Sequence, residues 1–278
     1  MSDPTAPGEG PPHADHLRFF FEPAATLTSV ADQRRRFAGA VSGLGDAELA
    51  APSRCGAWSV ADVLRHGIWF DDTMRAIWSG DRSVALGFDP RRTPDEHVRS
   101  ARGVADREVL SRYLASTEAV VTELVSAGPA RFAQPSRSPA GPVPWWLSAV
   151  HLGWDTAIHE RDVLLPLGRT VDADPAHSAA VLAYSLALAS FFAGPDPLDV
   201  AVGGVRLRRD DGPVEVWAPS PAPSGKGAAE GGVAVVTGDP VAIVDALAGR
   251  EGLPGAMDGP LAVVERLGGL ARYFTSPV

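Results

Sequence analysis

Three side chains that can bind a metal recur every four residues in the segment H-L-G-W-D-T-A-I-H-E-R-D, which begins at residue 151. They are His151, Asp155 and His159. In an α-helix, residues four apart share a face and drift by only about 40° per step, so all three would project from one stripe. The predicted helix around this segment, residues 145–167, is rich in Trp, Leu, Val and Ile, as in a buried helix. This arrangement favours a binding site over a solvated surface.

A fourth candidate ligand is His66, which lies on the apolar face of an earlier helical pattern. Two neutral imidazoles and a carboxylate suit zinc or another first-row divalent ion, and leave a position for water or a substrate. We expect a ligand set of His66, Asp155 and His159. His151 could replace Asp155, or all four residues could bind. The competing interpretation is that these residues are hydrogen-bonded parts of the core.

The residues after His159 suggest how that histidine could be oriented. Asp162 follows it by three positions and could accept a hydrogen bond from its ring, or could equally be a solvated residue on the helix surface. Glu160 and Arg161 are interpreted as an exposed pair.

Further candidates lie around the start of the earlier helix. Cys55 precedes a helix N-terminus, where a thiolate is stabilised, so it is either a nucleophile or a small packed side chain. Trp58 and Trp154 are candidates to line a pocket for a bound cosubstrate, although core packing is the expected role of most tryptophans here.

Composition narrows the class of protein. The chain has 278 residues, of which 45% are apolar, so it can bury a substantial core. Its net charge of −9, without a dense basic patch, argues against binding nucleic acid or an anionic membrane. One cysteine excludes an intramolecular disulfide and agrees with a cytoplasmic location. No apolar stretch is long enough to span a membrane. Monomer and dimer both remain open.

Periodicity predicts an α+β protein of two domains. Long helices are expected over 24–44, 59–78, 106–127 and 145–167, forming an antiparallel four-helix bundle, with a short helix after Pro94 and a proline-rich loop over 134–144. The chain then alternates as a helix over 176–192, a β-hairpin around Gly203, two further strands, and helices over 239–250 and 261–270. The domains predicted are a disordered tail over 1–17, a metal-binding helical bundle over 18–194 and a small α+β domain over 195–278.

Two motifs resemble those of the mycothiol-dependent maleylpyruvate isomerase family. R-C-G-A-W-S-V-A-D-V-L-R-H is similar to the family signature C-x-G-W-[ST]-x-x-[DE]-x-x-x-H, except that Ala57 separates the glycine from the tryptophan. H-L-G-W-D-T-A-I-H-E-R-D is similar to the second signature, a carboxylate four residues before a histidine. The usual glutamate is replaced by Asp155.

The resemblance implies a fold and a chemistry. The family's first domain is a bundle of the DinB type, and its second is a small α+β domain of the sterol-carrier type. The metal ligands would fall on His66, Asp155 and His159, the metal would be zinc or another divalent ion, and mycothiol would be the cosubstrate. The thiol would add to a small electrophilic substrate and either leave again, giving isomerisation, or stay, giving S-transfer. Arg250, or Arg206 and Arg208, could anchor an anionic substrate.

Two other functions remain open at this point. One is a thiol-independent metalloenzyme that tailors a secondary metabolite, which the replacement of glutamate by Asp155 favours. The other is a non-catalytic protein that holds a metal structurally or binds an apolar ligand.

Overall fold

The computed structural model describes the bundle almost completely and the C-terminal part in segments. The described residues are 22–81, 83–85, 87–89, 92–138, 141–171, 177–178, 180–182, 184–185, 200–202, 205–207, 215–216, 234–236 and 240–251. The expected tail over 1–17, the domain boundary near residue 195 and the helix over 261–270 lie outside them.

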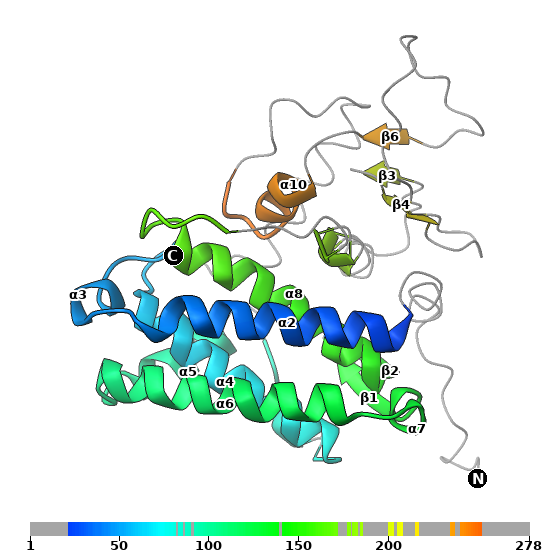
Figure 1. Cartoon of the computed structure of the whole chain (residues 1–278), viewed down its shortest axis with the longest axis horizontal. Helices are drawn as coiled ribbons and strands as arrows, with labels where there is room; N and C mark the ends of the chain where they lie inside the picture. The colour runs from blue at the N-terminus through cyan, green and yellow to red at the C-terminus, as the bar shows by residue number, and fades with distance from the viewer. Residues whose placement is uncertain are drawn as a thin grey trace.

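Four long helices form the bundle, and each agrees with a predicted helix to within three residues at either end (Figure 1). α2 and α4 each pack against both α6 and α8, so they occupy opposite corners of the bundle. The four helices are α2 (Pro23–Ser42), α4 (Val60–Trp78), α6 (Asp106–Ser126) and α8 (Trp145–Leu164). The prediction that neighbouring helices are all antiparallel is wrong. α2 runs parallel to α8, since Val30 meets Gly153 and Arg36 meets Glu160, and α4 runs parallel to α6. The periodicity of each helix carries no information on its direction relative to the others.

The start of α4 follows from its sequence. The Ser59 hydroxyl accepts a hydrogen bond from the Asp62 backbone N–H at 3.1 Å, and the Asp62 carboxylate accepts one from the Ser59 N–H at 3.3 Å. Two N–H groups that the helix itself leaves unpaired are satisfied in this way. Ser59 and Asp62 together therefore fix where α4 begins.

The proline-rich stretch over 134–144 is a correction, because it is not a simple loop. β1 (Pro135–Ser138) pairs antiparallel with β2 (Gly141–Pro144). A two-stranded ribbon has two free edges, so prolines whose missing N–H would face outward do not break its ladder. Short helices complete this half of the chain: α3 (Asp46–Leu49), η1 (Ser83–Ala85), α5 (Thr93–Ala101) and α7 (Pro129–Phe132).

The C-terminal part contains the strands and the helix that the sequence predicts. The strand order is β5-β4-β3-β6; β3 pairs antiparallel with β4, as expected for the hairpin, and parallel with β6. These strands are β3 (Val200–Val202), β4 (Val205–Leu207), β5 (Glu215–Val216) and β6 (Ala234–Val236), and the helix is α10 (Pro240–Leu247). α10 lies over α8 in Figure 1.

Two glycines allow neighbouring helices to approach closely beside the candidate ligands. A Cβ on Gly153 of α8 would lie 2.6 Å from Val30 Cγ2 of α2, and one on Gly67 of α4 would lie 2.8 Å from Tyr113 Cε2 of α6. Both contacts are shorter than side-chain carbons tolerate, so these positions require glycine. The backbone beside His66 and the backbone two residues before Asp155 are thereby held against neighbouring helices.

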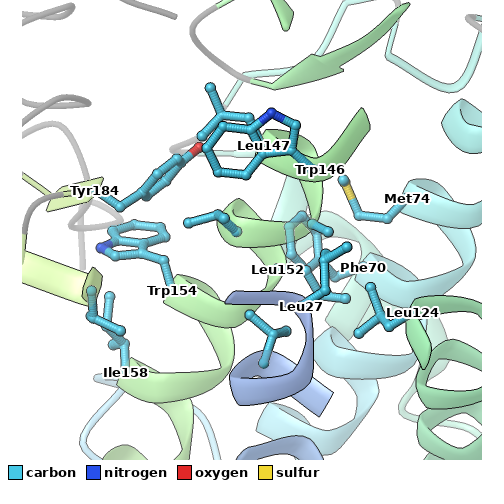
Figure 2. Packing of buried hydrophobic residues seen from close by; sticks show 14 of the residues in the cluster. Leu27, Phe70, Met74, Leu124, Trp146, Leu147, Leu152, Trp154, Ile158 and Tyr184 are labelled. Atoms are coloured by element: carbon cyan, nitrogen blue, oxygen red, sulfur yellow. The ribbon is translucent and has the colours of Figure 1, made fainter. Parts of the chain in front are cut away.

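The core of the bundle is aromatic and aliphatic. Figure 2 shows Trp154 and Tyr184 beside each other above Ile158, and Phe70, Met74 and Leu124 gathered on the opposite side. Within the described residues, no helix combines the length and the apolar character needed to cross a bilayer.

Candidate metal centre

One candidate ligand from α4 and two from α8 converge where these helices meet. His66 Nε2 lies 3.4 Å from Asp155 Oδ1, and His159 Nε2 lies 3.6 Å from the same oxygen. The three ligand atoms lie within 4.8 Å of one another. The side chains of Asp155 and His159 are 16% and 12% exposed, and that of His66 is 7% exposed.

This spacing fits a divalent ion. In a tetrahedral zinc site with bonds of about 2.0–2.1 Å, neighbouring ligand atoms are about 3.3–3.4 Å apart. The separations of 3.4 and 3.6 Å differ from this by a few tenths of an ångström at most. Imidazole nitrogen and carboxylate oxygen are also the donors that such ions prefer.

The local electrostatics place most of the cluster in a metal-binding state. Burial lowers the pKa of His66, so its imidazole is neutral. Burial opposes ionisation of Asp155, but His159 and His66 outweigh it and lower the pKa of Asp155 to about 2. Burial opposes protonation of His159 as well, yet Asp155, Cys55 and Asp162 raise its pKa well above the ordinary value. His159 therefore carries a proton that an incoming cation would displace.

Asp162 orients His159, and it is not the solvated residue that the sequence left open. Its side chain is fully buried, and Oδ2 lies 3.0 Å from His159 Nδ1. This contact turns Nε2 of the ring toward Asp155, as carboxylates commonly do for histidine ligands. Arg250 holds the carboxylate in turn, with Nε 2.9 Å from Oδ1 and 3.0 Å from Oδ2.

Cys55 joins this network from the loop that precedes α4. Its Sγ donates to Asp162 Oδ2 at 2.9 Å and lies 3.6 Å from His159 Nδ1. Arg250 Nη2 lies 3.3 Å from the same sulfur. Gly56, with φ of 57°, makes the tight turn that presents the thiol to α8. The Cys55 thiol therefore lies among His159, Asp162 and Arg250.

Trp58 is buried and packs against the two candidate histidines. Its ring centroid lies 5.3 Å from that of His66 and 6.4 Å from that of His159. Its Nε1 donates to Asp95 Oδ1 of α5 at 3.2 Å, which fixes the ring. Trp58 therefore lies at the cluster, where a bound cosubstrate could contact it.

His151 and Trp154 lie together in a different environment. The His151 ring stacks on Trp154 at 5.4 Å and meets Phe70 at 5.4 Å and Tyr184 at 5.5 Å. Burial lowers the pKa of His151 to about 4, and its Nδ1 is buried without a hydrogen-bond partner. Among the described residues, the groups of converging ligand atoms do not include His151.

The interpretation of Glu160 and Arg161 as an exposed pair is wrong. Glu160 is buried and accepts from Arg36 of α2 at 3.0 Å. Arg161 instead forms a forked ion pair with Asp245 of α10, at 3.0 Å from Nε to each carboxylate oxygen. The pattern could not show this, because both partners come from distant parts of the chain.

The docking of α10 is a feature that the sequence reasoning missed. The buried Asp245 also accepts from Arg54 Nη1 at 3.2 Å, so two arginines bind one carboxylate. Together with the pair of Arg250 and Asp162, this set of contacts holds residues 245–250 against the cluster. A charged residue inside the apolar run V-A-I-V-D-A-L was the available signal.

Fold and site together define a helical-bundle protein whose facing helices carry a His-Asp-His cluster suited to a divalent metal. Comparison with known proteins identifies a domain family and solved structures that share this architecture. Residues 30–164 match the model of the mycothiol maleylpyruvate isomerase N-terminal domain. The helical bundle of this chain therefore belongs to that domain family.

Solved structures show that the likeness in fold extends beyond the bundle. The crystal structure of the mycothiol-dependent maleylpyruvate isomerase is 12% identical, with a TM-score of 0.61 over 88% of this chain and 95% of that one. A histidine-to-alanine mutant of a mycothiol-dependent maleylpyruvate isomerase is 13% identical, with a TM-score of 0.57 over 84% and 92% of the two chains. At these identities, the likeness establishes the fold. No curated protein matches the sequence.

Proposed function

We propose that the chain is a divalent-metal-dependent enzyme that uses the low-molecular-weight thiol mycothiol to isomerise or S-conjugate a small electrophilic substrate. The observation that carries this proposal is the convergence of one oxygen and two nitrogens, from Asp155, His66 and His159, within 4.8 Å of one another. The match of the bundle to the N-terminal domain of mycothiol maleylpyruvate isomerase supports the thiol and the isomerase chemistry as the use of such a site.

His66, Asp155 and His159 would hold the ion, for which we propose zinc or another divalent metal. Bound there, it would supply a positive charge that lowers the pKa of a thiol or water near it. Asp162 fixes the ring of His159, and Trp58 shields the two histidines from bulk water on the side of α5. For Trp58 and Trp154 we propose a further role in contacting the thiol cosubstrate, Trp154 from the aromatic layer that it shares with His151.

Arg250 is the residue we propose to act on the substrate. All three of its side-chain nitrogens already bind within the protein, to Asp162, Cys55 and the Ala248 carbonyl. The first role of Arg250 is therefore to hold the Asp162 carboxylate in place. Because these contacts fix its guanidinium beside the cluster, it also places a permanent positive charge where an anionic substrate group would lie.

The proposal extends to the organisation of the chain. We propose a metal-binding bundle over 18–194 and a small α+β domain of the sterol-carrier type over 195–278. The antiparallel hairpin β3–β4 and the helix α10 support it. The partners would be a small-molecule substrate and a thiol, and not nucleic acid or a membrane. The location we propose is the cytoplasm.

Metal analysis tests the ligand set. We expect one divalent ion per chain in the wild-type protein, and its loss in His66→Ala and in His159→Ala. His151→Ala should keep the metal, because its ring lies in the aromatic layer. His97→Ala is a matched control on the exposed face of α5. Wild-type protein that holds no metal, even after reconstitution, would contradict the proposal. Metal loss in His151→Ala would make His151 a ligand.

A cobalt-substituted protein tests the thiol. Saturating mycothiol should add a sulfur-to-metal charge-transfer band to the cobalt spectrum. A spectrum that mycothiol leaves unchanged, although small anions alter it, would reject thiol chemistry in favour of a thiol-independent metalloenzyme. A spectrum that no ligand changes would indicate a closed, structural site.

A further inference from the structure

A buried ion pair lies at the centre of the bundle, away from the metal cluster. Arg34 Nη2 of α2 and Asp71 Oδ2 of α4 are 2.6 Å apart, and their side chains are 3% and 0% exposed. Because α2 and α4 occupy opposite corners, this pair spans the diagonal of the bundle. It is the kind of contact that can fix how four helices align.

The same two side chains also bind the other two helices. Arg34 Nη1 donates to Thr156 Oγ1 of α8 at 3.0 Å, and Nη2 donates to Thr117 Oγ1 of α6 at 3.3 Å. Asp71 Oδ2 accepts from Ser116 Oγ of α6 at 2.8 Å. One guanidinium and one carboxylate thus join all four long helices.

Stability alone does not explain such a pair. Removing two charges from water costs about as much as their attraction returns, so apolar side chains of similar size often stabilise a core equally well. The best-attested use of buried polar groups is to select one register among several. The pair therefore calls for a role that depends on geometry.

The position of the Arg34–Asp71 pair along α4 and α8 suggests such a role. Asp71 follows His66 by five residues, which is about 7.5 Å along the helix axis. Thr156 directly follows Asp155. By binding both, Arg34 connects the helix that carries one candidate ligand to the helix that carries the other two. The close approach of Gly153 to Val30 sets α8 against α2, which lets the Arg34 side chain reach α8 one turn further along.

We propose that Arg34 and Asp71 are positioning residues that fix the register of α4 against α8, and through it the separation of His66 from Asp155 and His159. This inference rests on the proposed metal site. Without the pair, the helices would still pack through their apolar faces, but the three ligand atoms would no longer be held at distances near those of a metal polyhedron.

The test replaces the pair with apolar side chains of similar size, as Arg34→Met with Asp71→Leu. We expect the double variant to fold with a melting temperature near that of the wild type, because no charge is left unpaired. Its cobalt affinity, measured by competition with a chelator, should fall at least tenfold, and its d–d absorption should change shape because the ligand geometry is altered. A purely structural role would leave that spectrum unchanged.

A matched control removes a different ion pair. Arg36 and Glu160 join α2 to α8 but do not reach α4, so Arg36→Met with Glu160→Leu should leave the cobalt spectrum as in the wild type. A milder variant, Thr156→Val, removes only the link from Arg34 to α8 and should weaken cobalt binding about threefold or more. It also decides the question if the double variant fails to fold.

The outcomes separate the two proposals. Wild-type protein that binds no metal would reject the proposed function itself. Wild-type protein that binds cobalt, with equal affinity and an identical spectrum in the double variant or in Thr156→Val, would overturn the positioning role alone. An equal loss of affinity in the Arg36 control would also overturn it, since any ion pair of α8 would then have the same effect.

Discussion

Gly153→Ala should destabilise the protein even though alanine is the better helix former. The added Cβ would lie 2.6 Å from Val30 Cγ2, and Val30 is β-branched and buried, so its side chain cannot rotate away. Relief requires α8 to move by roughly an ångström from α2, and overpacking of this kind costs about 1–3 kcal/mol. Alanine in place of glycine inside a helix returns about 1 kcal/mol.

A second glycine isolates the steric part of this effect. Gly39 lies inside α2, and a Cβ added there would meet nothing within 4 Å, so Gly39→Ala should gain about 1 kcal/mol from propensity alone. The two alanine variants should therefore differ by about 1–3 kcal/mol in unfolding free energy, which is the strain at Gly153. Chemical denaturation with unchanged m-values would measure the difference.

Val30→Ala should partly rescue Gly153→Ala, because it removes the atoms that collide. The coupling energy from the double-mutant cycle should reach about 1 kcal/mol or more in the favourable direction. Equal stability of Gly153→Ala and Gly39→Ala, or strictly additive effects with Val30→Ala, would refute the close approach of α2 and α8. The metal affinity of Gly153→Ala should also fall, since Asp155 lies two residues further on.

Three further predictions concern ionisable groups. Burial raises the pKa of Asp71 to about 6, although Arg34 opposes the shift. The folded protein then binds this proton more tightly than the unfolded one. As the pH falls from 7 to 4, the unfolding free energy of the wild type should therefore rise by up to about 3 kcal/mol relative to that of Asp71→Asn. A difference in stability between the two proteins that does not change with pH would contradict this. Asp162→Asn removes the charge that orients His159 and should weaken metal binding about 10–100-fold, measured by chelator competition; an unchanged affinity would disprove that role. Cys55→Ser keeps a donor to Asp162 and should retain turnover within about tenfold, whereas a loss beyond about a hundredfold, or about 2.7 kcal/mol, at unchanged metal content would make the thiol a reactant.

The helices of the bundle could be predicted because each has a complete local signal. The cap at Ser59 and the repeat of apolar residues every three to four positions define α4 without tertiary contacts. The spacing of Asp155 and His159 likewise follows from the geometry of one helix. The ribbon over 134–144 could not be predicted, because its prolines are individually typical of a loop and the pairing of β1 with β2 is a property of two segments together.

The parts of the site that sequence did not reveal depend on contacts between distant segments. Nothing near Arg161 shows that its partner is Asp245, and nothing near Arg34 shows that it meets Asp71 across the bundle. The role of Asp162 could be predicted from the sequence only in part. The spacing of Asp162 from His159 suggests the contact between these two side chains. Only the ion pair with Arg250, from a distant part of the chain, explains how the Asp162 carboxylate can be fully buried.

The docking of α10 has a consequence for the order in which the protein folds. Arg250 and Cys55 are separated by 195 positions in sequence, whereas His66 and Asp155 are separated by 89. Because closing a longer loop costs more chain entropy, contacts between nearer segments are expected to form first. During synthesis, the three candidate metal ligands leave the ribosome long before residues 245–250. A nascent bundle could therefore capture its ion while Asp162 and Arg161 still lack their partners. Activity would then require the docking of residues 245–250, since Arg250 is the last residue of the site to be synthesised.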